Sequence, residues 1–336
     1  MNRKLLIPCL LALACGLDAD AVLAQEGALR ERLHQRQQER VEAPSPAPPI
    51  SAPGDYRASL EHGGRTRLYR LYVPASYRAD RPAPLLVALH GGGGSMDYMG
   101  RDEYYGLLSF AERTGQVLLL PNGVSRLRSG KLATWNAGNC CGTARDAQVD
   151  DVGYIRAVVE RVQGQLNIDA RHIRATGMSN GAMMAYRLAC ELPGLFSAIA
   201  AVAGTDNTRG CTPAQPVSVL HIHARNDSHV LYDGGAGPDA VDRKLITDFR
   251  SVPDTVAGWV ERNRCAPVPQ RVLEKDGAWC ERYAPCAGGT QVQLCVTAAG
   301  GHSWPGGHKP RGEAPTQAID ANEVMWDFFS RLGVPR

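Results

Sequence analysis

The sequence of 336 residues lacks a strong excess of charge of either sign, and this absence excludes several kinds of partner. Its formal net charge at pH 7 is only +3, and no run of Lys and Arg is long enough to neutralise a row of phosphates. It also lacks an uninterrupted apolar stretch of about 20 residues, the length that spans a bilayer as a helix. We therefore expect neither a nucleic-acid partner nor a stable membrane span.

A Cys-x-x-Cys pair is missing as well, which removes a common ligand spacing of zinc sites. Beyond the N-terminal segment the cysteines form an even set, as expected for disulfides formed in an oxidising compartment: Cys140, Cys141, Cys190, Cys211, Cys265, Cys280, Cys286 and Cys295. Eight cysteines allow about 105 pairings. By proximity in sequence we favour Cys190 with Cys211 and Cys265 with Cys295. Neither a metal nor a cofactor is predicted.

The N-terminus has the pattern of an export signal. A basic start at residues 2–4 precedes an apolar stretch at residues 5–17, and small residues follow at 22–24. We predict a signal peptide over residues 1–24, and therefore a secreted or periplasmic protein. Lipoprotein anchoring is the alternative, because Leu-Ala-Cys at residues 13–15 resembles a lipidation site.

The composition changes twice along the chain. Residues 25–53 are polar and include a Pro/Ala/Ser tract that favours extended geometry and buries little, so we predict a linker. From residue 54 onward, alternating patterns on either side of Gly63-Gly64 predict an antiparallel hairpin. We assign residues 54–336 to one globular domain, because folds of this size commonly form a single unit.

Short apolar runs then alternate with helical patterns. We predict strands near residues 85–89, 117–120, 173–176, 199–202, 217–222 and 292–296. We predict helices near residues 105–113, 152–166, 182–192, 255–263 and 319–332. This alternation predicts an α/β fold with a mostly parallel central sheet and helices on both faces. Functional residues of such sheets lie at the carboxyl ends of the strands.

One such strand end carries Gly177-Met178-Ser179-Asn180-Gly181, followed directly by a predicted helix. A serine on a sharp strand-to-helix turn is a nucleophile elbow, and small residues two positions to either side let the two backbones pass. The alternative is a glycine-rich turn with a capping serine. We identify Ser179 as the candidate nucleophile.

A serine hydroxyl needs a base to take its proton, and after a nucleophile elbow an acid and then a histidine follow in the chain. Asp227 follows the predicted strand 217–222 and is the candidate acid, with Asp233 in reserve. His302 lies in a glycine-rich loop after strand 292–296 and is the candidate base, with His308 in reserve.

An oxyanion formed by attack of Ser179 requires backbone N–H donors. The N–H of Asn180, the residue after the serine, is the first candidate donor. The second is expected from the glycine-rich loop at residues 90–94, which leaves an early strand, and within it we favour Gly92.

Other residues have two interpretations each. Trp135 and Trp304 flank the predicted site loops and are candidate substrate-binding residues that form an apolar shelf, but tryptophans in loops also serve packing. Asp150-Asp151 precedes a helical pattern and indicates helix capping more than a catalytic carboxylate pair. His221 and His223 share one face of a strand, but no third ligand is placed to complete a metal site.

Taken together, several motifs resemble a known family: H-G-G-G-G-S, W-N-A-G-N-C-C-G-x-A, D-D-V-G-Y, G-M-S-N-G and G-G-H-S-W-P-G-G. They are similar to those of the polyhydroxybutyrate depolymerase-like esterases, which are related to feruloyl and acetylxylan esterases, and the resemblance runs from about residue 54 to the C-terminus. It implies an α/β-hydrolase fold and a secreted serine esterase that forms an acyl-enzyme through Ser179, Asp227 and His302. The chain departs from the family's H-G-x-x-D pattern before the acid, because Ala224 replaces the glycine.

The expected partner is a small-molecule, oligomeric or polymeric ester, either a hydroxyalkanoate or a feruloyl or acetyl polysaccharide ester. Two other functions are compatible with the fold. The same three residues cut amides in peptidases, and a hydrolase fold can serve binding alone. An intact serine, acid, histidine and glycine loop in this order favours catalysis. The sequence does not choose between the ester substrates.

Overall fold

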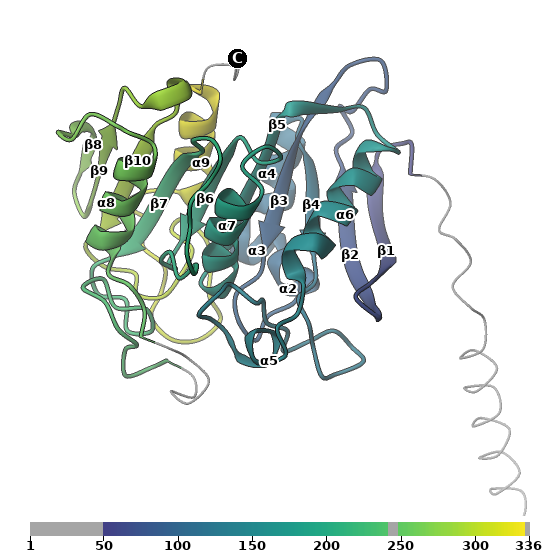
Figure 1. Cartoon of the computed structure of the whole chain (residues 1–336), viewed down its shortest axis with the longest axis horizontal. Coiled ribbons are helices and arrows are strands. Elements are labelled where there is room, and N and C mark those ends of the chain that lie inside the picture. The colour runs from purple at the N-terminus through teal and green to yellow at the C-terminus, as the bar shows by residue number, and fades with distance from the viewer. Residues whose placement is uncertain (1–49, 241–247, 333–336) are drawn as a thin grey trace, which may run out of the picture. The chain divides into compact units, whose positions relative to one another are not determined.

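Figure 1 presents the computed structural model, which describes residues 50–240 and 248–332. The predicted signal peptide and most of the predicted linker lie outside the described residues. None of the helices in these two ranges is long and apolar enough to cross a membrane.

Ten strands of the described residues form one sheet in the order β1-β2-β4-β3-β5-β6-β7-β10-β9-β8. Their bounds are β1 Gly54–His62, β2 Arg65–Val73, β3 Ala83–Leu89, β4 Val117–Pro121, β5 Ile168–Met178, β6 Ala198–Val202, β7 Ser218–Ala224, β8 Gln270–Lys275, β9 Ala278–Tyr283 and β10 Val292–Thr297. The six central strands are parallel, and β1, β2, β9 and β8 pair antiparallel at the two ends. The predicted mostly parallel α/β sheet is confirmed.

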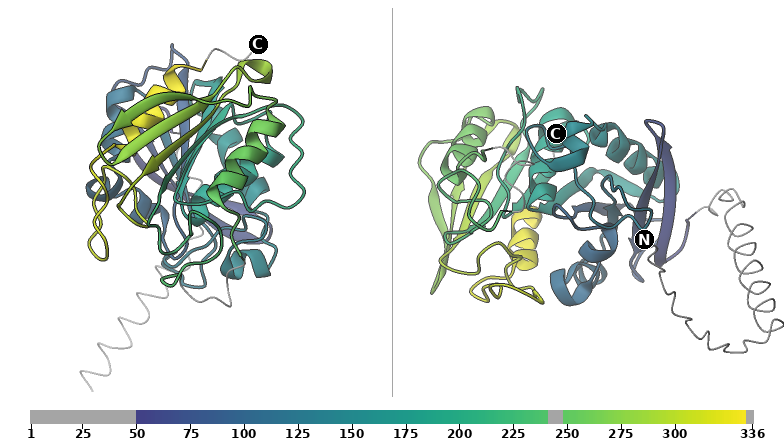
Figure 2. Two further views of the ribbon diagram at one scale, coloured as in Figure 1. Left: turned by 90° about the vertical axis from the view of Figure 1, so that its left-hand side faces the viewer. Right: turned by 90° about the horizontal axis from the view of Figure 1, so that it is seen from below.

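Helices cover both faces of this sheet (Figures 1 and 2). On one face lie α6 Asp151–Gln163, α7 Asn180–Glu191 and α8 Val252–Arg262, and on the other lie α4 Leu107–Thr114 and α9 Ala321–Ser330. The described residues also contain shorter helices: α2 Met96–Met99, α3 Asp102–Tyr105, α5 Gly142–Asp146 and the 3-10 turn Ala287–Gly289. Because both faces are covered, β4, β6, β7 and β10 are buried along their whole length, which explains why β4 and β6 are continuous apolar runs.

The hairpin of β8 and β9 was not predicted, and it corrects one disulfide. Cys190 pairs with Cys211 as predicted, but Cys265 pairs with Cys286 instead of Cys295. Cys295 pairs with Cys280, because these two residues face each other in the antiparallel register of β9 and β10. Cys140 and Cys141 form the fourth pair. Four disulfides fit a protein that folds in an oxidising compartment.

Candidate active site

Ser179 occupies the turn between strand β5 and helix α7. Its backbone has φ 56° and ψ −122°, a conformation that residues with a side chain rarely adopt. The Ser179 N–H donates to the carbonyl oxygen of Val202 on the neighbouring strand β6, at 2.8 Å. This bond and the following helix hold the strained turn at the carboxyl edge of the sheet.

Three glycines make this turn possible. A Cβ atom on Gly181 would overlap with the carbonyl oxygen of Leu89 at the end of β3, and one on Gly177 would overlap with the backbone of Gly181. A Cβ atom on Gly204, which follows β6, would overlap with the carbonyl oxygen of Ser179. The first two belong to the Gly-x-Ser-x-Gly motif, but only the fold brings Gly204 to the serine.

We expect Gly181→Ala to lower kcat at least about tenfold and to destabilise the fold by about 1–3 kcal/mol, because the main-chain carbonyl oxygens of Leu89 and His90 lie where the new Cβ would be. Thermal unfolding and ester hydrolysis measure the two effects. Gly164→Ala is the matched control, since its Cβ would lie 3.5 Å from the nearest atom, an ordinary contact, and its φ is negative. Equal behaviour of the two variants would contradict this account of the elbow.

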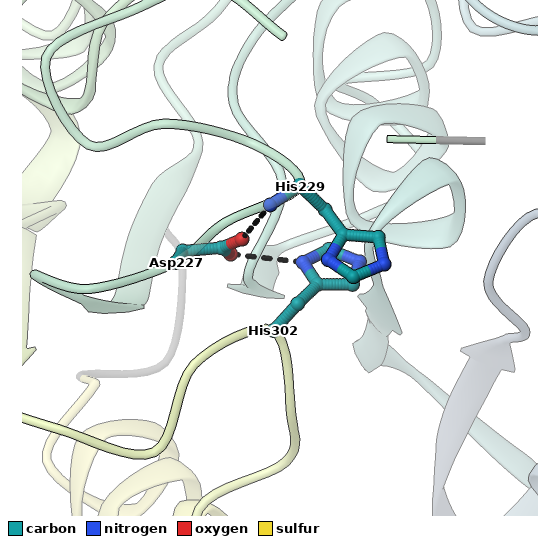
Figure 3. A group of neighbouring side chains, drawn as sticks. All are labelled: Asp227, His229 and His302. Atoms are coloured by element: carbon teal, nitrogen blue, oxygen red, sulfur yellow. Dashed lines mark hydrogen bonds and ion pairs between the residues drawn. The ribbon is translucent and has the colours of Figure 1, made fainter. Parts of the chain in front are cut away.

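Asp227 and His302 come together from two different strand ends (Figure 3). Asp227 follows β7 and His302 follows β10, and His302 Nδ1 lies 2.8 Å from Asp227 Oδ2. The other carboxylate oxygen of Asp227 accepts the backbone N–H groups of His229, at 2.8 Å, and Val230, at 3.0 Å. The carboxylate is therefore fixed in orientation and directed at the imidazole.

Burial by itself raises the pKa of Asp227, which is only 2% exposed. The hydrogen bonds from His223 and His302 act in the opposite direction, as does the positive charge of His302 when it is protonated, and they hold the pKa of Asp227 well below its ordinary range. Asp227 thus stays a carboxylate at every pH at which an imidazole can act as a base.

The two reserve candidates lie elsewhere. The side chain of Asp233 is 88% exposed and forms an ion pair with Arg225 at 3.7 Å. The His308 ring packs near Tyr104, with 6.1 Å between ring centroids. Neither residue hydrogen-bonds to His302 through its side chain in the part of the chain that the structure describes.

His229 is a neighbour that no sequence motif singles out. Its ring stacks on that of His302, with centroids 4.5 Å apart and an interplanar angle of 12° (Figure 3). The ligand atoms of Asp227, His229 and His302 lie within 4.8 Å of one another, which is close enough to consider a metal. However, Asp227 Oδ2 and His302 Nδ1 already bond to each other, so these two atoms are not free to bind a metal.

The glycine-rich loop at residues 90–94, which follows β3, lies against the elbow. A Cβ atom on Gly92 would lie 3.5 Å from the Cβ of Asn180, so the two candidate oxyanion donors belong to touching segments. Within residues 50–240 and 248–332, the N–H groups of Gly92 and Asn180 donate no hydrogen bond, whereas those of Gly93 and Gly94 donate to Ala133 and Gly91. Two unused donors therefore border Ser179.

The side chain of His90 holds this loop in shape through two hydrogen bonds. Its buried ring donates from Nδ1 to the carbonyl oxygen of Gly91, at 2.8 Å, and accepts at Nε2 from the N–H of Gly123, at 2.9 Å. Burial lowers the pKa of His90 from 6.5 to about 4. The bond from Gly123 needs the neutral ring, because a protonated Nε2 could not accept.

This low pKa predicts a loss of stability in acid. Between pH 6.5 and about 4 the unfolded chain takes up a proton at His90 that the folded protein refuses, so the free energy of unfolding falls as the pH falls, and the loss levels off below pH 4. The full shift corresponds to about 3 kcal/mol. Denaturant titrations at pH 7 and pH 4 should show a smaller difference for His90→Asn than for the wild type. An equal difference would contradict the assignment.

The two tryptophans do not form the expected shelf. Trp135 is 0% and Trp304 is 3% exposed, so neither offers a surface to a substrate. Trp135 instead ties the loop to the elbow, because its N–H donates to Asn180 Oδ1 at 2.7 Å and its indole N–H donates to the carbonyl oxygen of His90 at 2.9 Å. Trp304 packs edge-on against Tyr105. Loop packing explains both residues.

The acidic pair and the histidine pair also have structural roles. Asp150 caps helix α6 through the N–H of Gly153, as predicted, and Asp151 is buried against Arg67 at 2.6 Å. His221 and His223 hydrogen-bond to each other within the fold.

The sequence of residues 67–247 matches the family described as esterase PHB depolymerase. The chain belongs to this esterase family. It is therefore a carboxylic ester hydrolase, as its motifs predicted.

Individual relatives of this PHB depolymerase-family esterase are also named as esterases. It is 32% identical to a protein of Nocardia uniformis subsp. tsuyamanensis that is named as an esterase, over 76% of each chain. It is 32% identical to feruloyl esterase C of Emericella nidulans, over 78% of this chain and 83% of that protein. It is 27% identical to feruloyl esterase B of Piromyces equi over 78% of this chain, but it spans only 44% of the length of that relative.

A solved structure supports the fold. Acetyl xylan esterase from Aspergillus awamori superposes with a TM-score of 0.55 at 13% identity, covering 82% of this chain and 99% of that one. At this identity the likeness concerns the fold alone, and the PHB depolymerase-family chain has the α/β-hydrolase fold.

Proposed function

We propose that this chain is an exported serine esterase in which Ser179 is the nucleophile, His302 the general base and Asp227 the acid that orients the base. The hydrogen bond between Asp227 and His302 carries this proposal, because two residues 75 positions apart meet at the strand edge on which the strained Ser179 turn lies. The carboxylate accepts from Nδ1, which leaves Nε2 of a neutral His302 free to take a proton.

The reaction would proceed by acyl transfer. Ser179 Oγ attacks the ester carbonyl while its proton passes to His302 Nε2, and Asp227 stabilises the imidazolium that results. The N–H groups of Gly92 and Asn180 meet the negative charge on the carbonyl oxygen. His302 then returns the proton to the departing alcohol, and water repeats the sequence on the acyl-enzyme to release the acid.

The substrate class follows from the relatives. Their names include feruloyl esterases, and the family description is that of a PHB depolymerase, so we propose soluble feruloyl esters, acetyl esters or hydroxybutyrate oligomers as substrates. Export fits the disulfides together with the predicted signal peptide at residues 1–24. Signal peptide, linker and a catalytic domain from residue 54 remain the proposed organisation of the chain.

Two measurements test this function. Purified protein treated with a fluorophosphonate should carry one adduct, which peptide mass spectrometry should locate on Ser179. A panel of methyl ferulate, an acetylated xylooligosaccharide, a hydroxybutyrate trimer and a peptide amide should show hydrolysis of at least one ester and none of the amide at a comparable rate. Failure to label Ser179, or preference for the amide, would refute the proposal.

A further inference from the structure

A chain of hydrogen bonds between buried side chains leads from helix α7 to His223, which lies beside the carboxylate of Asp227. The Tyr186 hydroxyl lies 2.7 Å from His221 Nδ1, and His221 Nε2 lies 3.1 Å from His223 Nδ1. His223 Nε2 lies 2.8 Å from the carbonyl oxygen of Val230 and 3.3 Å from Asp227 Oδ2. The tyrosine and both histidines are almost completely shielded from solvent. The esterase mechanism above makes no use of them.

The carbonyl group of Val230 fixes the direction of every hydrogen bond in this chain. A carbonyl oxygen only accepts, so His223 Nε2 carries a hydrogen, and in a neutral ring Nδ1 is then an acceptor. His221 Nε2 must therefore donate to it, which leaves His221 Nδ1 to accept from the Tyr186 hydroxyl. The two imidazole planes differ by only 8°, as expected for rings joined edge to edge.

Because of Tyr186, every hydrogen bond of the chain can form only when both histidines are neutral. If His223 took a second proton at Nδ1, His221 would have to accept at Nε2 and carry its own hydrogen on Nδ1, facing Tyr186. The tyrosine hydrogen would then lose its acceptor, since within the described residues the hydroxyl bonds to His221 alone. A buried donor without a partner is unfavourable, so the complete chain opposes protonation of either histidine.

The surroundings of the chain also favour a protonated Tyr186 hydroxyl and a neutral His221. Burial raises the pKa of Tyr186 well above its usual value, so the hydroxyl remains a donor, and burial and the neighbouring His223 lower the pKa of His221 well below its usual value. The Tyr232 ring meets His223 edge-on at 6.1 Å. Near Tyr186, Asp206 and Arg262 form an ion pair at 3.5 Å, and their charges have opposite effects on the pKa of Tyr186.

We propose that Tyr186, His221 and His223 are positioning residues that hold His223 as a neutral N–H donor toward Asp227, so that the negative charge of this carboxylate is reserved for His302. This inference rests on the proposed function, because it assigns His302 as the base that becomes cationic during acyl transfer.

The need for such a device follows from the distances. Two imidazole rings lie close to the same oxygen, since Asp227 Oδ2 is 2.8 Å from His302 Nδ1 and 3.3 Å from His223 Nε2. A cationic His223 would neutralise Asp227 and place a second positive charge beside the imidazolium that must form on His302. A neutral His223 helps to fix the carboxylate without competing for its charge.

The test is the pH profile of Tyr186→Phe. In this variant both protonation states lose the hydrogen bond between residue 186 and His221. The hydroxyl hydrogen that has no acceptor in the protonated state is also removed, so His223 takes up a proton more readily. For a soluble short-chain acyl ester, kcat/KM of the wild type should fall below neutral pH with the slope of one proton. The variant should lie within about threefold of the wild type at pH 9, at least about fivefold below it at pH 6, and approach a two-proton slope.

A second substitution separates charge from structure. In the double variant Tyr186→Phe/His223→Gln, the introduced glutamine cannot be protonated, although its amide can still donate, so the one-proton slope should return. Tyr154→Phe is the matched control, because Tyr154 is equally buried and donates to the carbonyl oxygen of Leu68 at 2.6 Å, on a different helix. Its profile should keep the wild-type shape.

The outcomes are distinct from those that test the proposed function. If wild-type Ser179 is labelled by the fluorophosphonate but Tyr186→Phe keeps the wild-type profile, or the second proton persists in the double variant, this inference is wrong and the esterase assignment stands. If Tyr186→Phe does not fold, single variants decide: His223→Gln should retain at least about ten times the kcat of His223→Leu at similar KM. Equal kcat values would overturn the inference.

Discussion

Ser179→Ala should abolish ester hydrolysis, with kcat reduced by at least about four orders of magnitude and KM changed little. The reason is that the hydroxyl supplies the atom that bonds to the substrate carbon, whereas the remaining groups of the site only bind and polarise the carbonyl. The fold should be unaffected, because the side chain of Ser179 forms no hydrogen bond within the described residues and alanine keeps the Cβ that the turn already accommodates.

The measurement is the steady-state rate on a soluble acyl ester, with circular dichroism and thermal unfolding as checks of folding. Ser197→Ala is the matched control, since Ser197 precedes β6 at the amino edge of the sheet and donates to the carbonyl oxygen of Ile173 at 3.2 Å, far along the strand from the elbow. It should keep nearly full activity. More than a tenth of the wild-type rate in a verified, pure Ser179→Ala sample would remove Ser179 from its role.

The sequence was most informative where local pattern and sheet position coincide. Ser179 stands in a motif whose glycines have local steric reasons, and the strands preceding Asp227 and His302 are short, buried and mostly apolar. Since parallel strands end at one edge, the order of these three residues along the chain was enough to expect the contact between Asp227 and His302 that the structure contains.

Features that depend on pairing across the sheet were not accessible. Strand β8 is exposed along most of its length and lacks a clear alternation, so its hairpin with β9 was not predicted. Without β9, the register that joins Cys280 to Cys295 could not be derived. Gly204 and His229 are further examples. Each is an ordinary loop residue in the sequence and becomes part of the site only because a neighbouring strand end brings it against Ser179 or His302.

Asp227→Asn should be nearly as damaging as loss of the serine, with kcat lowered by about four orders of magnitude near neutral pH. The two backbone N–H groups that now bond to Asp227 Oδ1 would hold the amide oxygen of the new side chain, so its NH2 group would face His302 Nδ1. His302 would then have to accept at Nδ1 and carry its hydrogen on Nε2. In that tautomer it cannot take the proton of Ser179.

Asp233→Asn is the control that the structure provides, because it makes the same chemical change only six positions along the chain. Its carboxylate is 88% exposed and faces Arg225, so its neutralisation should change kcat less than about twofold. Both variants should keep the thermal stability needed to measure rates at 25 °C, and fluorophosphonate labelling of Ser179 should slow in parallel with kcat for Asp227→Asn alone. If Asp233→Asn were the impaired variant, the hydrogen bond between Asp227 and His302 would be structural, and the acid of the site would have to reach His302 through a rearranged loop.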